Sequence, residues 1–112
     1  MKVATHLPIP AVMSLKKLGR DIKDARKRRR VTVLLMAQRA GVSRATINKV
    51  ENGDPTASMG AYTAVLFALG MLERLKDLAD GSHDVTGRQL ADEKLPQRIR
   101  MPRQPKAGNR HD

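Results

Sequence analysis

The sequence predicts an all-α fold of five helices, and three observations lead to this prediction. Apolar residues recur at helical spacing in successive stretches between Leu15 and Leu78. Residues that end helices, among them Gly41 and Gly70, follow these stretches. No stretch alternates with period two for long enough to indicate a sheet.

The first helix is expected to begin after Ser14, a suitable N-cap, because residues 1–13 carry two prolines and show no helical period. We therefore expect residues 1–13 to form a flexible, extended arm. The apolar stripe of the first helix is Leu15, Leu18, Ile22 and Ala25, and its opposite face is basic. The run RKRRR at residues 26–30 closes it, where cations suit the negative end of the helix dipole.

Two short helices are expected next. The second starts after Thr32 and ends near Ala40, stopped by Gly41. Ser43 is positioned to cap the third, which covers residues 44–52 and ends at Gly53. Two short helices with a glycine at the bend are typical of the helix-turn-helix motif.

The fourth helix carries an apolar stripe, and Gly70 is its stop signal; the stripe is Met59, Tyr62, Val65, Leu66 and Leu69. Leu72, Leu75 and Leu78 follow at strict spacings of three, which predicts a short fifth helix. We interpret this stripe as a homodimer seam, with a place in the core as the alternative. The domain would then cover residues 14–80.

Residues 81–112 are predicted to form a basic, largely flexible tail, because they are rich in glycine and proline and poor in large apolar residues. A weak helix over residues 85–94 is expected, and no independent order from Pro96 onward.

Positive charge gathers at one end of the chain. The 22 Lys and Arg exceed the 11 Asp and Glu, giving a net charge of +11. Residues 1–30 hold ten bases and two acids, residues 31–80 five of each, and residues 81–112 seven bases and four acids. A localised basic footprint suits a polyanion, because each neutralised phosphate releases condensed counterions.

The spacing of small and apolar residues indicates how the two short helices pack. Ala37 is small where the helix backbones must approach, and Val42, Ile47 and Val50 are expected to face inward. The outward residues of the third helix have the chemistry of a base-reading surface, since Arg, Lys and Asn donate to base edges and methyl groups meet thymine. They are Arg44, Ala45, Thr46, Asn48 and Lys49, with Asn52 at the end of the helix.

At these positions AGVSRATINKVENG resembles the Cro/C1-repressor-type (XRE) helix-turn-helix family, whose five-helix, lambda-repressor-like domain residues 15–70 follow. The resemblance implies base contacts from Arg44, Ala45, Thr46 and Lys49. It implies phosphate contacts from Thr32, Ser43, Asn48 and Asn52. Where the family often places Thr-Gln, Val33 follows Thr32, and we expect Arg28 and Arg30 to supply the missing phosphate contact.

A narrower resemblance covers the rest of the chain. GDPTASMGAYTAVLFALGMLERLKDLAD and the later LADEKLPQRIR are similar to HipB-type antitoxins, which bind operator DNA and HipA-like serine/threonine kinases. The resemblance implies a dimeric repressor in the bacterial cytoplasm, associated with the nucleoid, with a kinase toxin as partner. The alternative is a stand-alone XRE-type transcriptional regulator.

The apolar run Val33, Leu34 and Leu35 is unusual at the start of such a helix, because one core cannot bury all three side chains. Two interpretations are open: Leu34 and Leu35 pack beneath the arm or against the first helix, or one of them lies in a protein contact.

Other function classes are disfavoured. His6, His83 and His111 form no catalytic or metal-ligating spacing, and the chain has no cysteine and no glycine-rich phosphate loop, so we expect neither an enzyme nor a cofactor or metal. With one Tyr and one Phe, the chain lacks the stacking residues of single-strand and RNA readers. No apolar stretch is long enough to span a membrane or to form a secretory core.

Overall fold

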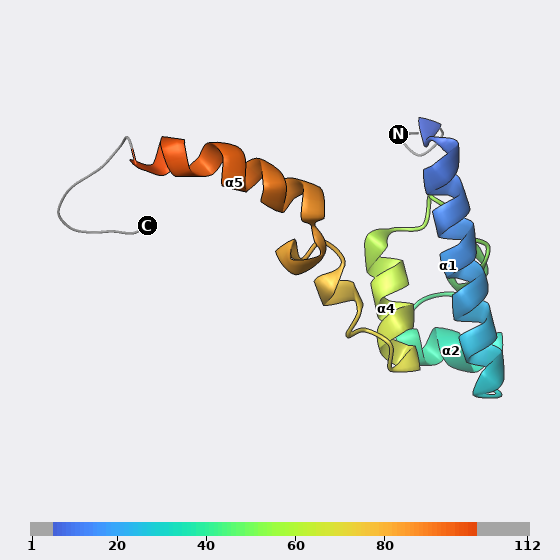
Figure 1. The fold of residues 1–112 in the computed structure, drawn as a ribbon. Helices are drawn as coiled ribbons and strands as arrows, with labels where there is room; N and C mark the ends of the chain where they lie inside the picture. Colours follow the sequence, from blue (N-terminus) through green and yellow to red (C-terminus); the bar gives the residue numbers. More distant parts are fainter. Residues whose placement is uncertain (1–5, 101–112) are drawn as a thin grey trace. The chain divides into compact units, whose positions relative to one another are not determined.

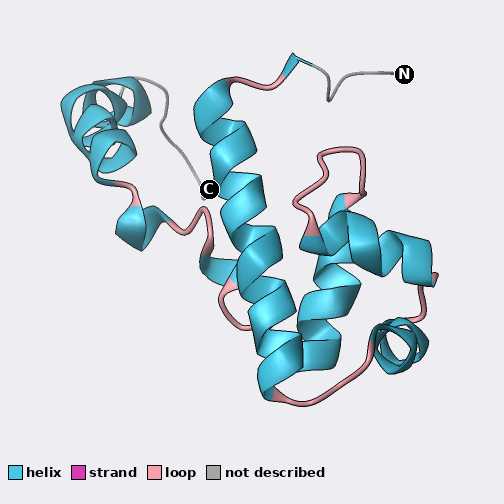
Figure 2. Ribbon diagram, turned by 90° about the vertical axis from the view of Figure 1, so that its right-hand side faces the viewer, coloured by secondary structure: helices cyan, strands magenta, loops and turns pink. Residues whose placement is uncertain are grey.

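The computed structural model describes residues 6–100, and side chains as far as Glu93. All regular secondary structure in these residues is helical, which confirms the predicted all-α class (Figures 1 and 2). The elements are α1 (Ile9–Arg28), α2 (Val33–Ala40), α3 (Arg44–Glu51), α4 (Met59–Leu69), η2 (Leu75–Asp77), η3 (Gly81–His83) and α5 (Val85–Arg100). The chain divides into two compact units between Leu75 and Lys76. Within the described residues no helix is long and apolar enough to cross a membrane.

Helix α1 begins at Ile9, so the predicted start after Ser14 is wrong. Pro8 is the N-cap residue and Pro10 lies in the first turn, where a helix has no partner for the backbone N–H that proline lacks. The hydroxyl of Ser14 donates to the carbonyl of Pro10 at 3.0 Å instead of capping a helix. The two prolines therefore open the helix, and only residues 1–5 of the predicted arm lie outside the described residues.

The core of the first unit lies between α1, α2, α3 and α4. Its five largest fully buried side chains are Ile22, Met36, Ile47, Val50 and Val65. Ala37 is also buried, and Val42 is half-buried against the same cluster, as the spacing predicted. The core therefore joins the long α1 to all three shorter helices that follow it.

The predicted starts of α2 and α3 and the predicted ends of α2 and α4 are confirmed; α3 ends one residue before the predicted Asn52, and the cap at Ser58 was not predicted. The hydroxyls of Thr32, Ser43 and Ser58 accept hydrogen bonds from backbone N–H groups three residues further on, at 3.1, 3.0 and 3.0 Å, and so cap α2, α3 and α4. Gly41 ends α2 with a φ of 71° and Gly70 ends α4 with a φ of 76°.

Backbones of α1 and of the segment after α3 touch directly at two glycines. A Cβ on Gly19 would lie 2.6 Å from the Gly53 nitrogen and 2.7 Å from the carbonyl oxygens of Val50 and Glu51. Gly53 in turn lies against the backbone of Leu15 and has a φ of 66°. The lack of a Cβ at both positions lets α3 sit directly on α1.

The predicted fifth helix over Leu72, Leu75 and Leu78 is wrong: the segment holds only the 3₁₀ turn η2. Residues at strict spacings of three stay aligned on a 3₁₀ turn, which has 3.0 residues per turn, but drift off one face of an α-helix. Leu72 and Leu75 are half-buried, and Leu78 is 69% exposed. The fifth α-helix in the described residues is α5 instead.

Helix α5 starts at Val85, as expected, but continues through Pro96 to Arg100. The prediction of no order from Pro96 onward is therefore wrong as far as Arg100, because an internal proline costs a helix hydrogen bond without having to end the helix. Residues 101–112 of the predicted tail lie outside the described residues.

Gly19→Ala should lower the free energy of unfolding by about 1–3 kcal/mol or more, because the new methyl group meets backbone atoms that cannot rotate away. Urea denaturation followed by circular dichroism measures this change. Gly60→Ala is the matched control, since its Cβ would meet only the Ser58 hydroxyl, at 3.6 Å. That variant should match the parent chain or exceed it by up to about 1 kcal/mol. Equal stability of the two variants would contradict the close approach at Gly19.

Candidate nucleic-acid interface

Helices α2 and α3 form a helix-turn-helix, with the turn at residues 41–43. Ile47 and Val50 are fully buried and fix one side of α3 against the core. The other side of the helix faces solvent. An eight-residue helix held in this way has one face free to enter a major groove.

A buried ion pair ties α3 to α1. The Arg26 Nε donates to Glu51 Oε2 at 2.6 Å, and its Nη2 donates to Oε1 at 3.0 Å. Nη1 donates to the carbonyl of Val31 at 2.8 Å, so the same guanidinium also holds the segment that leads into α2. Both residues are buried, with 8% of each exposed, and the hydrogen bond with Glu51 raises the pKa of Arg26.

The basic run at residues 26–30 hides this ion pair in the sequence, because Arg26 is the first of its five bases. A signal was present: Arg26 follows Ile22 by four residues, and Glu51 follows Ile47 by four. Both therefore lie on the inward faces of their helices. A basic and an acidic residue at inward positions of two packed helices predict a pair.

Most of the predicted base-reading residues are open to solvent. Arg44, Ala45, Asn48 and Lys49 are exposed on α3, whereas Thr46 is half-buried. The Thr46 hydroxyl accepts a hydrogen bond from the Ser43 hydroxyl at 3.0 Å. The structure thus places all the residues predicted to contact bases on one short helix: Arg44, Ala45, Thr46 and Lys49. Their contacts with bases stay a prediction.

Of the predicted phosphate-contacting residues, Asn48 lies on α3 itself and the others flank this helix; their contacts with phosphate also stay a prediction. Thr32 and Ser43 stand at the N-termini of α2 and α3, and Asn52 follows the last residue of α3. Arg28 and Arg30 lie at the end of α1 and are exposed. Because the single hydroxyl hydrogen of Ser43 points to Thr46, a phosphate contact from Ser43 requires this hydrogen to turn outward.

Arg30 has an uncommon backbone conformation, with a φ of 56°. It is the only non-glycine residue with positive φ among those described. Its N–H donates to the carbonyl of Lys27 at 2.9 Å, and that of Val31 donates to the carbonyl of Arg26 at 3.2 Å, which is the Schellman ending of α1. The left-handed conformation costs about 1–2 kcal/mol for a residue with a Cβ. A glycine at this position would be less strained.

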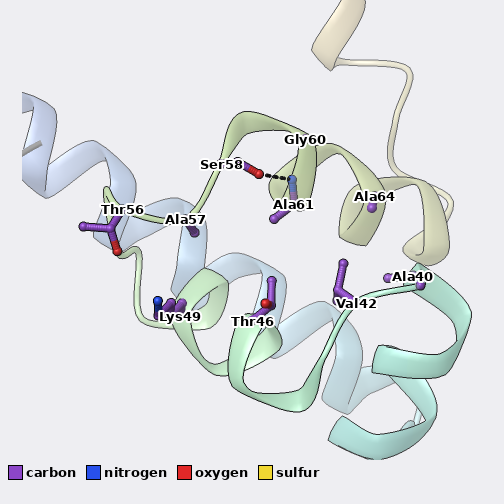
Figure 3. A pocket seen from close by; sticks show the side chains of 11 residues that line it. Ala40, Val42, Thr46, Lys49, Thr56, Ala57, Ser58, Gly60, Ala61 and Ala64 are labelled. Carbon is purple, nitrogen blue, oxygen red and sulfur yellow. Dashed lines mark hydrogen bonds between the residues drawn. The ribbon is translucent and has the colours of Figure 1, made fainter. Parts of the chain in front are cut away.

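A hollow of about 410 Å³ opens between α3 and α4, beside the exposed face of α3 (Figure 3). Thr46 and Lys49 line it from α3, and Gly60, Ala61 and Ala64 line it from α4. The connecting segment borders it with Thr56, Ala57 and Ser58. Small side chains and hydroxyl groups form most of its wall. Among the residues that line it, Lys49 alone is charged.

The loop beside this hollow is held by Asp54. Its Oδ1 accepts from the N–H and the hydroxyl of Thr56 at 2.8 and 2.7 Å, and these hydrogen bonds lower the pKa of the carboxyl. The buried Tyr62 donates its hydroxyl to the Asp54 carbonyl at 2.9 Å, and desolvation raises the pKa of that phenol. The loop is therefore anchored on α4 by one side chain and one backbone carbonyl.

The apolar start of α2 divides between core and surface. Val33 and Leu35 are half-buried and pack against the core, whereas Leu34 is 51% exposed. The structure therefore supports the packing interpretation for Leu35 and leaves Leu34 as the exposed residue of the run.

Comparison with known proteins gives one family. Residues 17–79 match the family model described as "Helix-turn-helix domain". The match begins eight residues inside α1 and covers all of α2, α3 and α4. No curated protein and no solved structure matches the chain significantly.

Arg30→Gly should be more stable to urea than Arg30→Ala by about 1 kcal/mol, because only glycine relieves the left-handed backbone. If Arg30 contacts a phosphate, both variants should lose duplex affinity equally, since both lose the guanidinium. Fluorescence anisotropy with a labelled duplex measures the affinity. If either variant bound the duplex as tightly as the parent chain, Arg30 would not be a phosphate-contacting residue.

Proposed function

Because this chain belongs to the helix-turn-helix domain family, we propose that it is a sequence-specific regulator of transcription that reads duplex DNA with α3. The observation that carries the proposal is the exposed polar face of α3, Arg44, Asn48 and Lys49, on a helix whose other side is buried at Ile47 and Val50. Arginine and lysine donate to guanine edges in the major groove, and asparagine bridges adenine.

Phosphate contacts would position this helix. The exposed arginines at the end of α1 and the N-termini of α2 and α3 flank the reading face. Hydroxyls, backbone N–H groups and guanidinium groups are the usual phosphate donors of DNA-binding proteins. Residues 1–30 carry ten bases against two acids, so the attraction to DNA would be strongest beside α1.

We infer that the protein acts as a homodimer, since operators read by helix-turn-helix proteins commonly have two half-sites one helical turn apart. Occupation of a promoter by such a dimer represses transcription by occlusion. The contribution of Leu72, Leu75 and Leu78 to the dimer seam stays a prediction.

A narrower role as the antitoxin of a toxin-antitoxin pair is supported by the resemblance of residues 53–80 and 90–100 to HipB-type proteins. In this role the dimer would also hold a HipA-like serine/threonine kinase in an inactive form. The alternative is a stand-alone regulator without a toxin partner. A kinase-sized open reading frame beside the gene, whose untagged product co-purifies with this chain, favours the antitoxin; its absence favours the alternative.

Arg44→Ala and Lys49→Ala should each weaken binding to the preferred duplex by about 1–3 kcal/mol and change binding to random duplex far less. The preferred duplex is first selected from a randomised library with the parent protein. Affinities for both duplexes are then measured at one salt concentration.

Arg28→Ala is the matched control, because it removes one exposed guanidinium outside α3. It should weaken both duplexes equally and reduce the slope of log affinity against log salt by about 1. If Arg44→Ala behaved like Arg28→Ala, Arg44 would be a phosphate-contacting residue and not a base reader.

A further inference from the structure

Helix α4 is apolar on all sides, which is unusual for a helix at the surface of a small domain. No charged residue occurs from Pro55 to Leu72, a run of 18 residues and the longest such run in the chain. A helix that is hydrophobic all round is normally buried on all sides. In this structure α4 buries only Ala61, Tyr62, Val65 and Leu69.

The outer side of α4 carries a stripe of Met59, Thr63 and Phe67, which we name the α4 stripe. Its members follow one another at spacings of four, so they lie on one side of the helix. Met59 is 65% exposed and Phe67 is 69% exposed. The hydroxyl of Thr63 donates to the Met59 carbonyl at 2.8 Å, so its one hydrogen-bond donor is used within the helix.

Phe67 is the single phenylalanine of the chain, which has no tryptophan and one tyrosine. The tyrosine, Tyr62, is buried in the core, whereas the phenylalanine stands in solvent. Exposed aromatic side chains are the residues that most often anchor protein interfaces, because they bury a large area at little entropic cost.

We propose that the α4 stripe is the surface on which two copies of this chain pair about a two-fold axis. This surface would join the two copies of the regulator proposed above. It rests on the proposed function only because that function requires two copies of the chain. In a two-fold interface the same patch occurs on both sides, so an uncharged patch meets an uncharged patch.

The net charge makes an uncharged surface the place where a second copy can bind with least repulsion. Two chains of +11 repel each other, and association is least opposed where neither carries charge. An acidic partner would instead be recognised by the basic faces, since the α4 stripe offers it no cation and no free donor. Neither Met59 nor Phe67 lines the hollow beside α3, so pairing through them need not cover Thr46 or Lys49.

The test is sedimentation equilibrium of the full chain without DNA. The parent chain should be a dimer, and Phe67→Glu should raise the dimer dissociation constant at least about tenfold, because two buried carboxylates would face an apolar surface. Helix content of Phe67→Glu should match that of the parent, since the side chain lies outside the core. Leu34→Glu, an exposed leucine on α2, is the control and should remain dimeric.

The salt dependence of the dimer dissociation constant distinguishes this uncharged interface from an ionic one. The parent dimer should become tighter between about 0.05 and 0.5 M salt, because screening weakens the repulsion of two basic chains. A dimer that weakens with salt would overturn the proposal. So would a monomeric parent chain, a dimeric Phe67→Glu, or dissociation by Leu75→Glu with Phe67→Glu unaffected.

The proposal and the DNA-binding function fail separately. Phe67→Glu should still prefer the selected duplex over random duplex, because α3 is unchanged, although with lower affinity for a site of two half-sites. If the parent chain bound the selected and the random duplex with equal affinity, the proposed DNA-reading function would be refuted and the dimer surface would not be affected. If Phe67→Glu kept both its preference for the selected duplex and its dimer, only the dimer surface would be refuted.

Discussion

The buried ion pair between Arg26 and Glu51 is the interaction on which the rest of the first unit depends. Two guanidinium nitrogens bind the carboxylate at 2.6 and 3.0 Å, and the third binds the Val31 carbonyl at 2.8 Å. A single side chain thus joins α1, the entry to α2 and the last residue of α3. Burying two charges is costly, and only a geometry that satisfies their donors and acceptors offsets this cost.

The glycine contact sets the distance at which this pair forms. Gly19 and Gly53 bring the backbone of α1 against the end of α3, where any Cβ would overlap backbone atoms. Arg26 then meets Glu51 two turns further along α1. With one side of α3 fixed by this contact and by Ile47, its opposite side is left to solvent. The exposed polar face of α3 is therefore a consequence of how α1 and α3 pack.

Sequence reasoning predicted the parts that depend on local chemistry. Thr32 and Ser43 cap helices and Gly41 ends one because these effects act over three or four residues. The outward residues of α3 were also predictable, from helical periodicity alone. Three features were missed: prolines that open a helix at Ile9, leucines that suit a 3₁₀ turn, and a pair between residues 25 apart in the sequence. The prolines and the leucine spacing carry local signals. The ion pair depends on how two helices pack, which only the inward positions of its two residues indicate.

A double-mutant cycle tests the central role of the ion pair most directly. Unfolding free energies are measured by urea for the parent, Arg26→Met, Glu51→Leu and the double variant. We predict that each single variant loses about 3–5 kcal/mol, because it leaves one buried charge without a partner. The double variant should lose less than the sum of the two, with a coupling of about 1–3 kcal/mol. Losses that add to within about 0.5 kcal/mol would contradict the account, because the two side chains would then act independently.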